Sequence, residues 1–105
     1  MTRFRLEISE AAAADILEQA EWYESRASGD VAAKWERAVT ATVLRILEYP
    51  HAGPVTVFKN PELANIRRIP VNDFPRHLIF YRISGEVIVI VRLVHGARDL
   101  QSLFF

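Results

Sequence analysis

The sequence contains no cysteine, which excludes a disulfide framework, a thiolate metal site and a thiol nucleophile. Long apolar runs are also absent. The longest, residues 87–91, is far shorter than the ~20 residues that a membrane-spanning helix needs. The first nine residues alternate charged and apolar side chains, a pattern that fits neither a signal peptide nor a membrane anchor. These absences predict a cytoplasmic protein that does not enter a membrane.

Few residues are suited to catalysis. The four glycines are scattered singly, so no glycine-rich phosphate loop is present, and no serine lies in a GxSxG motif. The three histidines, His51, His77 and His95, form neither an HxxxH nor an HExxH pair, although His77 and His95 fall at the ends of two strands expected to pair. The sequence therefore predicts no metal, no cofactor and no catalytic residues.

Length and composition indicate one folded domain over residues 1–105, since half of the residues are apolar and a quarter are charged. The formal net charge is zero, but residues 1–64 carry −3 and residues 65–105 carry +3. All six bases of the second segment are arginines, which suit planar contacts to carboxylates or phosphates. They are Arg67, Arg68, Arg76, Arg82, Arg92 and Arg98. A solvated sheet face without a binding role remains an alternative interpretation of the same residues.

Hydrophobic spacing predicts a strand followed by two helices. Residues 2–8 alternate, which predicts a half-buried strand with Phe4, Leu6 and Ile8 on one face. Ser9 can cap a first helix, which we expect to end near Gly29 in a left-handed closing conformation. Its apolar stripe includes Tyr23, and its opposite, solvated face is expected to carry Asp15, Glu18 and Glu21.

Asp30 is the expected cap of a second helix, which Pro50 ends. Its apolar stripe runs through Val31, Trp35, Ala38, Val39, Thr42, Val43, Ile46 and Leu47. Because only a few residues separate the two helices, we expect an antiparallel hairpin whose stripes face a common core.

The second half of the chain predicts strands. Proline, glycine and asparagine make residues 50–65 a crossing loop, and a strand begins near Ile66, where Pro70 indicates a sheet edge or a bulge. Residues 77–83 and 86–95 flank Ser84 and Gly85 as a hairpin. Residues 87–91 are apolar on both faces, as in a central strand, and the apolar tail 97–105 is expected to fold back as a short helical turn. The predicted fold is α+β in the order β-α-α-β-β-β, with a mainly antiparallel sheet.

Two phrases, RHLIFYRI and VIVIVRLVHGARD, resemble the ParE-like branch of the RelE/ParE toxin superfamily. The resemblance covers nearly the whole chain, in the segments Ala14 to Tyr23, Leu47 to Gly53, Ile66 to Val71, His77 to Arg82 and Val94 to Asp99. It implies a toxin of a type II toxin-antitoxin system that inhibits DNA gyrase by protein contact. It also implies a ParD-like antitoxin that wraps and neutralises the toxin.

On this resemblance, partner contacts are expected from arginines of the sheet and from exposed apolar side chains. The candidates are Arg68, Arg82, Arg92, Arg98, Leu103, Phe104, Phe105, Trp22 and Trp35. The apolar tail and the two tryptophans also suggest a homodimer or a hetero-oligomer with the antitoxin.

The superfamily resemblance carries an alternative, a RelE-like ribonuclease that cleaves messenger RNA on the ribosome. Its catalytic set would be Arg67, Arg68, Arg76 and Arg98. At the position where such enzymes place a tyrosine, this chain has Phe104, which has no hydroxyl, and arginine stays protonated near neutrality. His77 or His95 would then have to supply the acid or base. A third interpretation is a relative that binds an antitoxin but has lost its toxicity.

Overall fold

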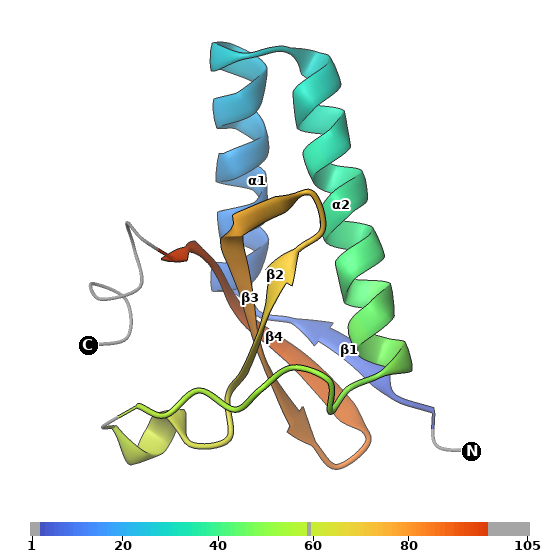
Figure 1. Ribbon diagram of the computed structural model, residues 1–105, viewed down its shortest axis with the longest axis vertical. Coiled ribbons are helices and arrows are strands. Elements are labelled where there is room, and N and C mark those ends of the chain that lie inside the picture. Colours follow the sequence, from blue (N-terminus) through green and yellow to red (C-terminus); the bar gives the residue numbers. More distant parts are fainter. Residues whose placement is uncertain (1–2, 59, 97–105) are drawn as a thin grey trace.

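The computed structural model describes residues 3–58 and 60–96 of the chain (Figure 1). Within this part, the elements follow the predicted order and confirm the α+β fold. They are β1 (Arg5–Ile8), α1 (Glu10–Arg26), α2 (Gly29–Glu48), the short 3-10 helix η1 (Pro61–Leu63), β2 (Arg67–Val71), β3 (Phe74–Ser84) and β4 (Val87–His95). The expected helical turn at residues 97–105 lies outside the described residues.

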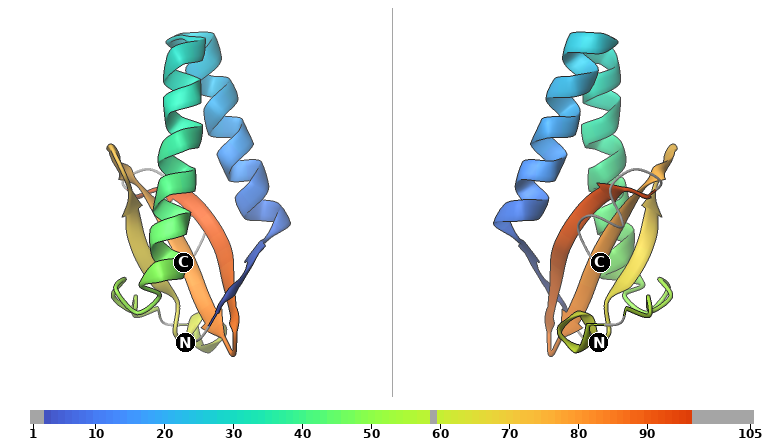
Figure 2. Two further views of the ribbon diagram at one scale, coloured as in Figure 1. Left: turned by 90° about the vertical axis from the view of Figure 1, so that its right-hand side faces the viewer. Right: turned by 90° about the vertical axis from the view of Figure 1, so that its left-hand side faces the viewer.

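The four strands form one mainly antiparallel sheet in the order β1-β4-β3-β2. β1 pairs with β4 in parallel, and the two other pairings are antiparallel. β4 therefore lies inside the sheet, as expected, while β2 is an edge strand with a register shift at Pro70, also as expected. The antiparallel helices run side by side and extend beyond one end of the sheet (Figure 2). No helix in the described part of the chain is both long and apolar enough to cross a membrane.

Ser9 connects the first strand to the first helix. Its side-chain oxygen accepts a hydrogen bond from the Ala12 amide at 3.0 Å, which confirms the predicted cap, and its hydroxyl donates to the Val91 carbonyl at 2.7 Å. The start of α1 is thereby attached to β4. The expected burial of Ile8 is wrong: this side chain is 46% exposed, because β1 is short and lies at the sheet edge.

The turn between the helices differs from its prediction. α1 ends at Arg26. Gly29 is the first residue of α2, and its φ is not left-handed. The cap of α2 is Ser28 and not Asp30: the extended Ser28 accepts a hydrogen bond from the Val31 amide at 3.2 Å. Only two residues separate the helices. The serine cap at the start of α2 is therefore found where a glycine that closes the end of α1 was expected. Asp30 lies in the first turn, where its charge favours the positive end of the helix dipole.

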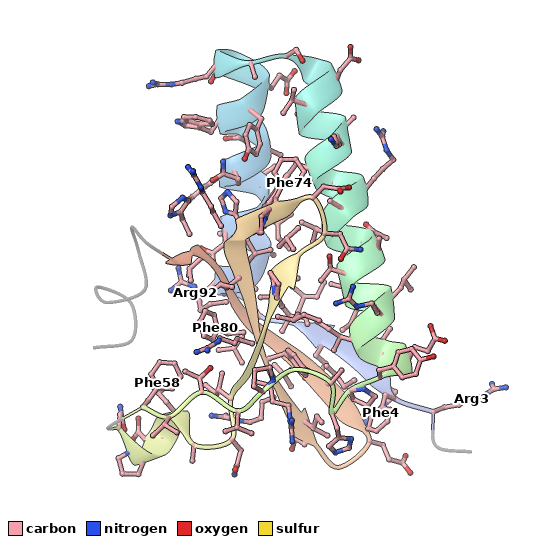
Figure 3. All side chains as sticks on the ribbon, viewed as in Figure 1. Arg3, Phe4, Phe58, Phe74, Phe80 and Arg92 are labelled. Carbon is pink, nitrogen blue, oxygen red and sulfur yellow. The ribbon has the colours of Figure 1, made fainter. Side chains whose placement is uncertain are left out.

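Two clusters of buried side chains lie on opposite faces of the sheet. The larger one lies under the helices and contains Trp35, Ile46, Tyr81, Ile88 and Ile90 among others. The smaller one contains Ile66, Phe80 and Val94, with Phe58 and Leu63 packed against it. Because neighbouring residues of a strand point to opposite faces of the sheet, Tyr81 belongs to the larger cluster and Phe80 to the smaller one. Figure 3 shows Phe74 beside the helices and Phe58 and Phe80 farther from them.

A bulge in β4 interrupts the alternation of its side chains. Phe80 pairs with Arg92, but the next residue, Tyr81, pairs with Ile90, which leaves Val91 as the extra residue. Beyond this bulge, Leu93 joins Ile88 and Ile90 in the larger cluster, where strict alternation would have placed it on the other face.

Candidate functional site

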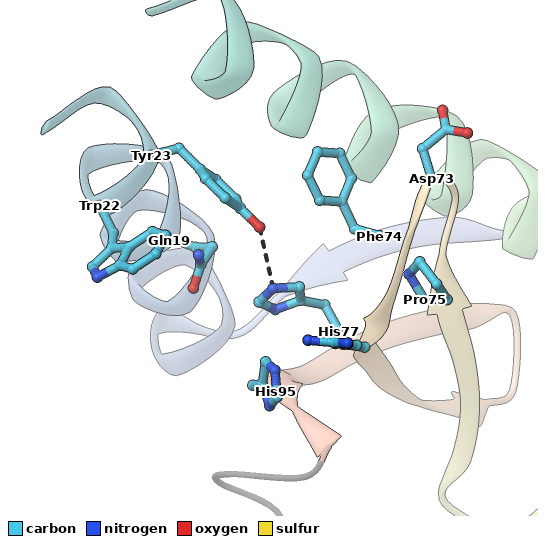
Figure 4. Close-up of a pocket in the computed structure, with 9 residues that line it drawn as sticks. Gln19, Trp22, Tyr23, Asp73, Phe74, Pro75, His77 and His95 are labelled. Atoms are coloured by element: carbon cyan, nitrogen blue, oxygen red, sulfur yellow. Dashed lines mark hydrogen bonds between the residues drawn. The ribbon is translucent and has the colours of Figure 1, made fainter. Parts of the chain in front are cut away.

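An open pocket lies between the second half of α1 and the ends of β3 and β4 (Figure 4). Its volume is about 440 Å³. We call it the α1–hairpin pocket, and its walls are Gln19, Trp22, Tyr23, Asp73, Phe74, Pro75, Arg76, His77 and His95. A smaller hollow continues from it along α1 to Asp15 and Glu18 and shares Trp22 and both histidines.

Aromatic packing holds the pocket wall in place. Tyr23 and Trp35 come from the two helices, and Phe74 begins β3. The Tyr23 ring lies 5.5 Å from the Phe74 ring and 5.9 Å from the Trp35 ring, and the Trp35 and Phe74 rings are 5.2 Å apart, edge to face. Edge-to-face contacts of this kind add stability beyond the burial of apolar area. The pocket therefore has a packed aromatic floor.

His77 and His95 are register partners across β3 and β4, as the sequence suggested. Their ring centroids are 5.2 Å apart and the ring planes are nearly perpendicular. His77 is buried against Trp35, and its Nε2 atom lies 3.5 Å from the Tyr23 hydroxyl. Among residues 3–58 and 60–96, no group of three or more His, Asp or Glu side chains is placed to hold a metal ion.

An ion pair fixes α1 against the sheet next to this pocket. Asp15 accepts hydrogen bonds from Nε and Nη2 of Arg92, both at 2.8 Å, and from the Leu93 amide at 3.0 Å. The Asp15 side chain is only 14% exposed. Its expected place on a solvated helix face is therefore wrong, because the carboxylate flanks the apolar stripe and turns toward β4.

Three of the predicted arginines bond to other parts of the described chain. Besides the Arg92 ion pair, Arg67 donates to the carbonyls of His51 and Gly53 at 3.2 and 2.7 Å, and Arg82 donates to the Glu62 carbonyl at 2.8 Å. These three guanidinium groups connect the loop after α2, the 3-10 helix and α1 to the sheet. The structure thus gives each of them a role within the fold.

The remaining predicted arginines do not form one cluster. Arg68 lies on β2 opposite Phe80, and Arg76 lies at the rim of the α1–hairpin pocket. Both are exposed. Phe80 and Arg76 are four residues apart on β3, which is about 13 Å along a strand. Arg98, Leu103, Phe104 and Phe105 lie outside the described residues.

The two tryptophans differ. Trp22 is 46% exposed and lines the pocket, and the Arg26 guanidinium lies 5.6 Å from its ring centre. Trp35 is fully buried and donates from Nε1 to the Ile16 carbonyl at 3.1 Å. The expected exposure of Trp35 is therefore wrong, because this residue lies in the middle of the inward stripe of α2.

Tyr81 anchors the loop after α2. Its hydroxyl donates to the Pro50 carbonyl at 2.8 Å and accepts from the Gly53 amide at 3.2 Å. Burial raises the pKa of Tyr81 above its ordinary value of 10.0, while the Gly53 amide and the nearby Arg67 charge oppose that rise. A side chain at position 53 would come within 2.6 Å of the Tyr81 hydroxyl and 2.7 Å of the Arg68 carbonyl, so glycine is required here.

The sequence did not single out Gln19, Tyr23, Asp73, Phe74 and Pro75 as site residues. Tyr23 could be assigned only to the apolar stripe, since nothing in its spacing shows that its hydroxyl faces a histidine 54 residues later. The sequence predicted this strand only from His77, yet β3 already begins at Phe74. Trp22, Arg76 and the pairing of His77 with His95 were the available signals for this place.

The comparisons with known proteins agree with this architecture. The model of a family described as "ParE toxin of type II toxin-antitoxin system, parDE" matches residues 6–100. The chain belongs to the ParE toxin family. This ParE-family chain is also similar to a solved structure entitled "Chromosomal ParDE TA system from P. aeruginosa", with a TM-score of 0.73 and 18% identity over 89% of this chain and 96% of that one. At that identity the likeness concerns the fold alone. No curated protein matches the sequence.

Proposed function

We propose that this ParE-family chain is a toxin that inhibits DNA gyrase by protein-protein contact and that a cognate ParD-like antitoxin neutralises it. The family match over residues 6–100 carries the proposal. The chemistry of the described residues supports it against the ribonuclease alternative. Arg67, one of the four residues that the alternative needs, holds the loop after α2.

The α1–hairpin pocket is the proposed place of antitoxin contact. A half-exposed tryptophan above a packed aromatic floor is the kind of residue that dominates binding energy at protein interfaces. The rim offers Arg76 and Asp73, so charges of both signs surround an apolar wall. An apolar side chain from an antitoxin helix or extended segment fits this combination.

Purified gyrase tests the proposed target. Adding the purified chain to a supercoiling assay should inhibit the enzyme, and prior addition of the cognate antitoxin should restore supercoiling. A parallel assay with ribosomes programmed with messenger RNA provides the contrast. Cleavage of messenger RNA in the ribosomal A site, with gyrase unaffected, would contradict the proposal in favour of the RelE-like alternative.

The antitoxin site has a matched pair of variants. We expect Trp22→Ala to weaken antitoxin binding by about 30-fold or more, the usual effect of removing an interface tryptophan. Leu17→Ala is the control, because Leu17 is a comparably exposed apolar residue of α1 that does not line the pocket. Calorimetric titration of each variant with the antitoxin gives the comparison, and equal affinities would remove Trp22 from the site.

A further inference from the structure

The first strand, β1, leaves one edge of the sheet open. In both views of Figure 2, β1 is the outermost strand on the side opposite β2. The amides of Arg5 and Ser9 donate to carbonyl groups on the β4 side, at 2.8 and 3.0 Å. Because successive residues of a strand turn their backbone groups to opposite sides, the amides and carbonyls of Leu6 and Ile8 point outward. Within the described part of the chain, no hydrogen bond satisfies these outward groups, so the edge can accept another strand.

The opposite edge of the sheet is partly covered. Val55 of the loop after α2 forms a bridge with Arg67 of β2. The Arg68 amide donates to the Pro54 carbonyl of the same loop at 3.1 Å. Farther along β2, Pro70 has no amide hydrogen to offer to a further strand. The β1 edge is therefore the more accessible of the two.

We infer that the open edge of β1 binds the same edge of a second copy of the chain, in an antiparallel strand pair about a two-fold axis at Leu6. In this register Leu6 lies opposite Leu6 of the other copy, and Phe4 lies opposite Ile8. The axis is perpendicular to the sheet, so the two sheets join into one, with the helices of both copies on the same face. The inference concerns the chain by itself and does not depend on the proposed action on gyrase.

Charge complementarity supports this register. Phe4 and Leu6 pack against the larger cluster under the helices, so Arg5 and Glu7 point to the other face, where both are exposed. With the axis at Leu6, Arg5 of each copy lies directly opposite Glu7 of the other. These are positions without mutual backbone hydrogen bonds, where the Cα atoms approach to about 4.5 Å and the side chains are closest. The symmetry gives two such ion pairs, and opposite charges directly across a strand pair are favourable.

The neighbouring registers are unfavourable. Since the outward groups of Leu6 and Ile8 must meet outward groups of the partner, the two strands can slide only in steps of two residues. One such step moves the axis to Arg5 and places the two copies of Arg5 opposite each other. A step in the other direction moves the axis to Glu7 and does the same with the two glutamates. Like charges directly opposite each other destabilise a strand pair, so only the axis at Leu6 avoids this repulsion.

Apolar contacts support the same register. Ile8 is 46% exposed, although Phe4 and Leu6 on the same face of β1 are partly buried. In the dimer, the Phe4 ring of the other copy lies opposite Ile8. Pairs of an aromatic and a β-branched residue are among the favourable cross-strand combinations, and the symmetry provides this pair twice. The exposed end of β1 is thereby covered, and the larger clusters of the two copies become continuous.

The dimer is expected to be weak because the strand is short. β1 has four residues, roughly 13 Å at about 3.3 Å per residue, and such a contact belongs to the smallest class of specific interfaces. We expect a dissociation constant on the order of 10–100 µM. Sedimentation equilibrium of the full chain between about 1 and 500 µM should show a rise from the monomer mass of 12.0 kDa toward twice that value.

Charge reversals test the register. Arg5→Glu and Glu7→Arg should each weaken the dimer at least about tenfold, because each change makes both ion pairs repulsive. An equimolar mixture of the two variants should associate within about threefold of the parent chain, since a copy with two acids then faces a copy with two bases. Arg37→Glu and Glu36→Arg are the controls, because they make the same changes of charge at exposed positions of α2. Alone or mixed, the controls should alter association less than about twofold.

A backbone change tests the strand pairing itself. Ile8→Pro removes an outward amide and leaves the hydrogen bonds between β1 and β4 in place, so the chain should stay monomeric up to about 500 µM. Ile8→Ala keeps that amide and should still dimerise, with a loss of about fivefold for the missing side-chain contact. Far-UV circular dichroism confirms that each variant is folded.

Three results would overturn the inference. One is a parent chain that stays monomeric over the whole concentration range, which would leave the edge to a strand of a different protein. Another is a dimer that Arg5→Glu and Ile8→Pro leave intact, since the copies would then meet through another face. The third is a mixture of the two charge variants that associates no better than either variant alone.

Discussion

Among single residues, Asp15 bonds a helix directly to the sheet. Its carboxylate accepts two hydrogen bonds from Arg92 and one from the Leu93 amide. We expect Asp15→Asn to lower the free energy of unfolding by about 2 kcal/mol, because an amide has one acceptor oxygen and no charge. Urea unfolding measures the change. Glu18→Gln, on the exposed surface one turn away, is the control and should stay within about 0.5 kcal/mol of the parent chain.

Tyr81 makes stability depend on pH in the alkaline range. Its folded-state pKa is raised above 10.0 by burial, so the folded protein holds this proton more tightly than the unfolded chain does. The corresponding stability is complete below pH 10 and is lost as the pH rises through the folded-state pKa. The urea midpoint should therefore fall above about pH 10. Tyr81→Phe should be less stable at neutral pH by about 1–2 kcal/mol and should lose less on the alkaline side. A parallel decline in both proteins would contradict this assignment.

Residue types alone could not separate the roles of the two tryptophans. Both are rare aromatic side chains on helices, but Trp35 lies at the centre of the inward stripe of α2, whereas Trp22 of α1 is 46% exposed. The same limit applies to the arginines. Whether Arg67 bonds to a ligand or to the Gly53 carbonyl depends on a loop whose path the sequence does not encode in any periodic signal.

At the scale of elements, the turn between α1 and α2 provides a direct test of capping. Ser28→Ala should destabilise the protein by about 1 kcal/mol, because the Val31 amide loses its partner at the start of α2. Asp30→Ala should cost only a few tenths of a kcal/mol, the loss of a charge near the helix dipole. Thermal or urea unfolding of the two variants compares them. A larger effect at Asp30 would mean that the aspartate caps the helix in solution.

Periodic signals predicted the elements well, and local geometry limited the rest. The apolar stripe of α2, the edge position of β2 and the central position of β4 followed from spacing and from Pro70. The β4 bulge did not, because an extra residue in one strand leaves no mark in an uninterrupted apolar sequence. Arg92, next to this bulge, bonds to Asp15 beside the candidate site. The bulge that the sequence did not predict therefore affects the surroundings of that site.

For the whole molecule, toxicity in cells is the decisive measurement. We expect Arg98→Ala to slow growth arrest, because loss of one charged contact should weaken target binding by roughly tenfold. Arg3→Ala, at an exposed position near the N-terminus, is the control and should leave growth arrest unchanged at equal expression. Full growth arrest by Arg98→Ala would show that this guanidinium does not contact the target.

The parallel pairing of β1 with β4 has a consequence for biosynthesis. β1 leaves the ribosomal tunnel before the other three strands of the sheet, and its sheet neighbour lies at residues 87–95. Until those residues emerge, Arg5–Ile8 has no backbone partner in the sheet, and the larger cluster lacks Ile88 and Ile90. A nascent chain of this kind cannot complete its sheet before β4 has emerged, so fragments from interrupted synthesis that lack β4 should be unfolded and harmless to the cell.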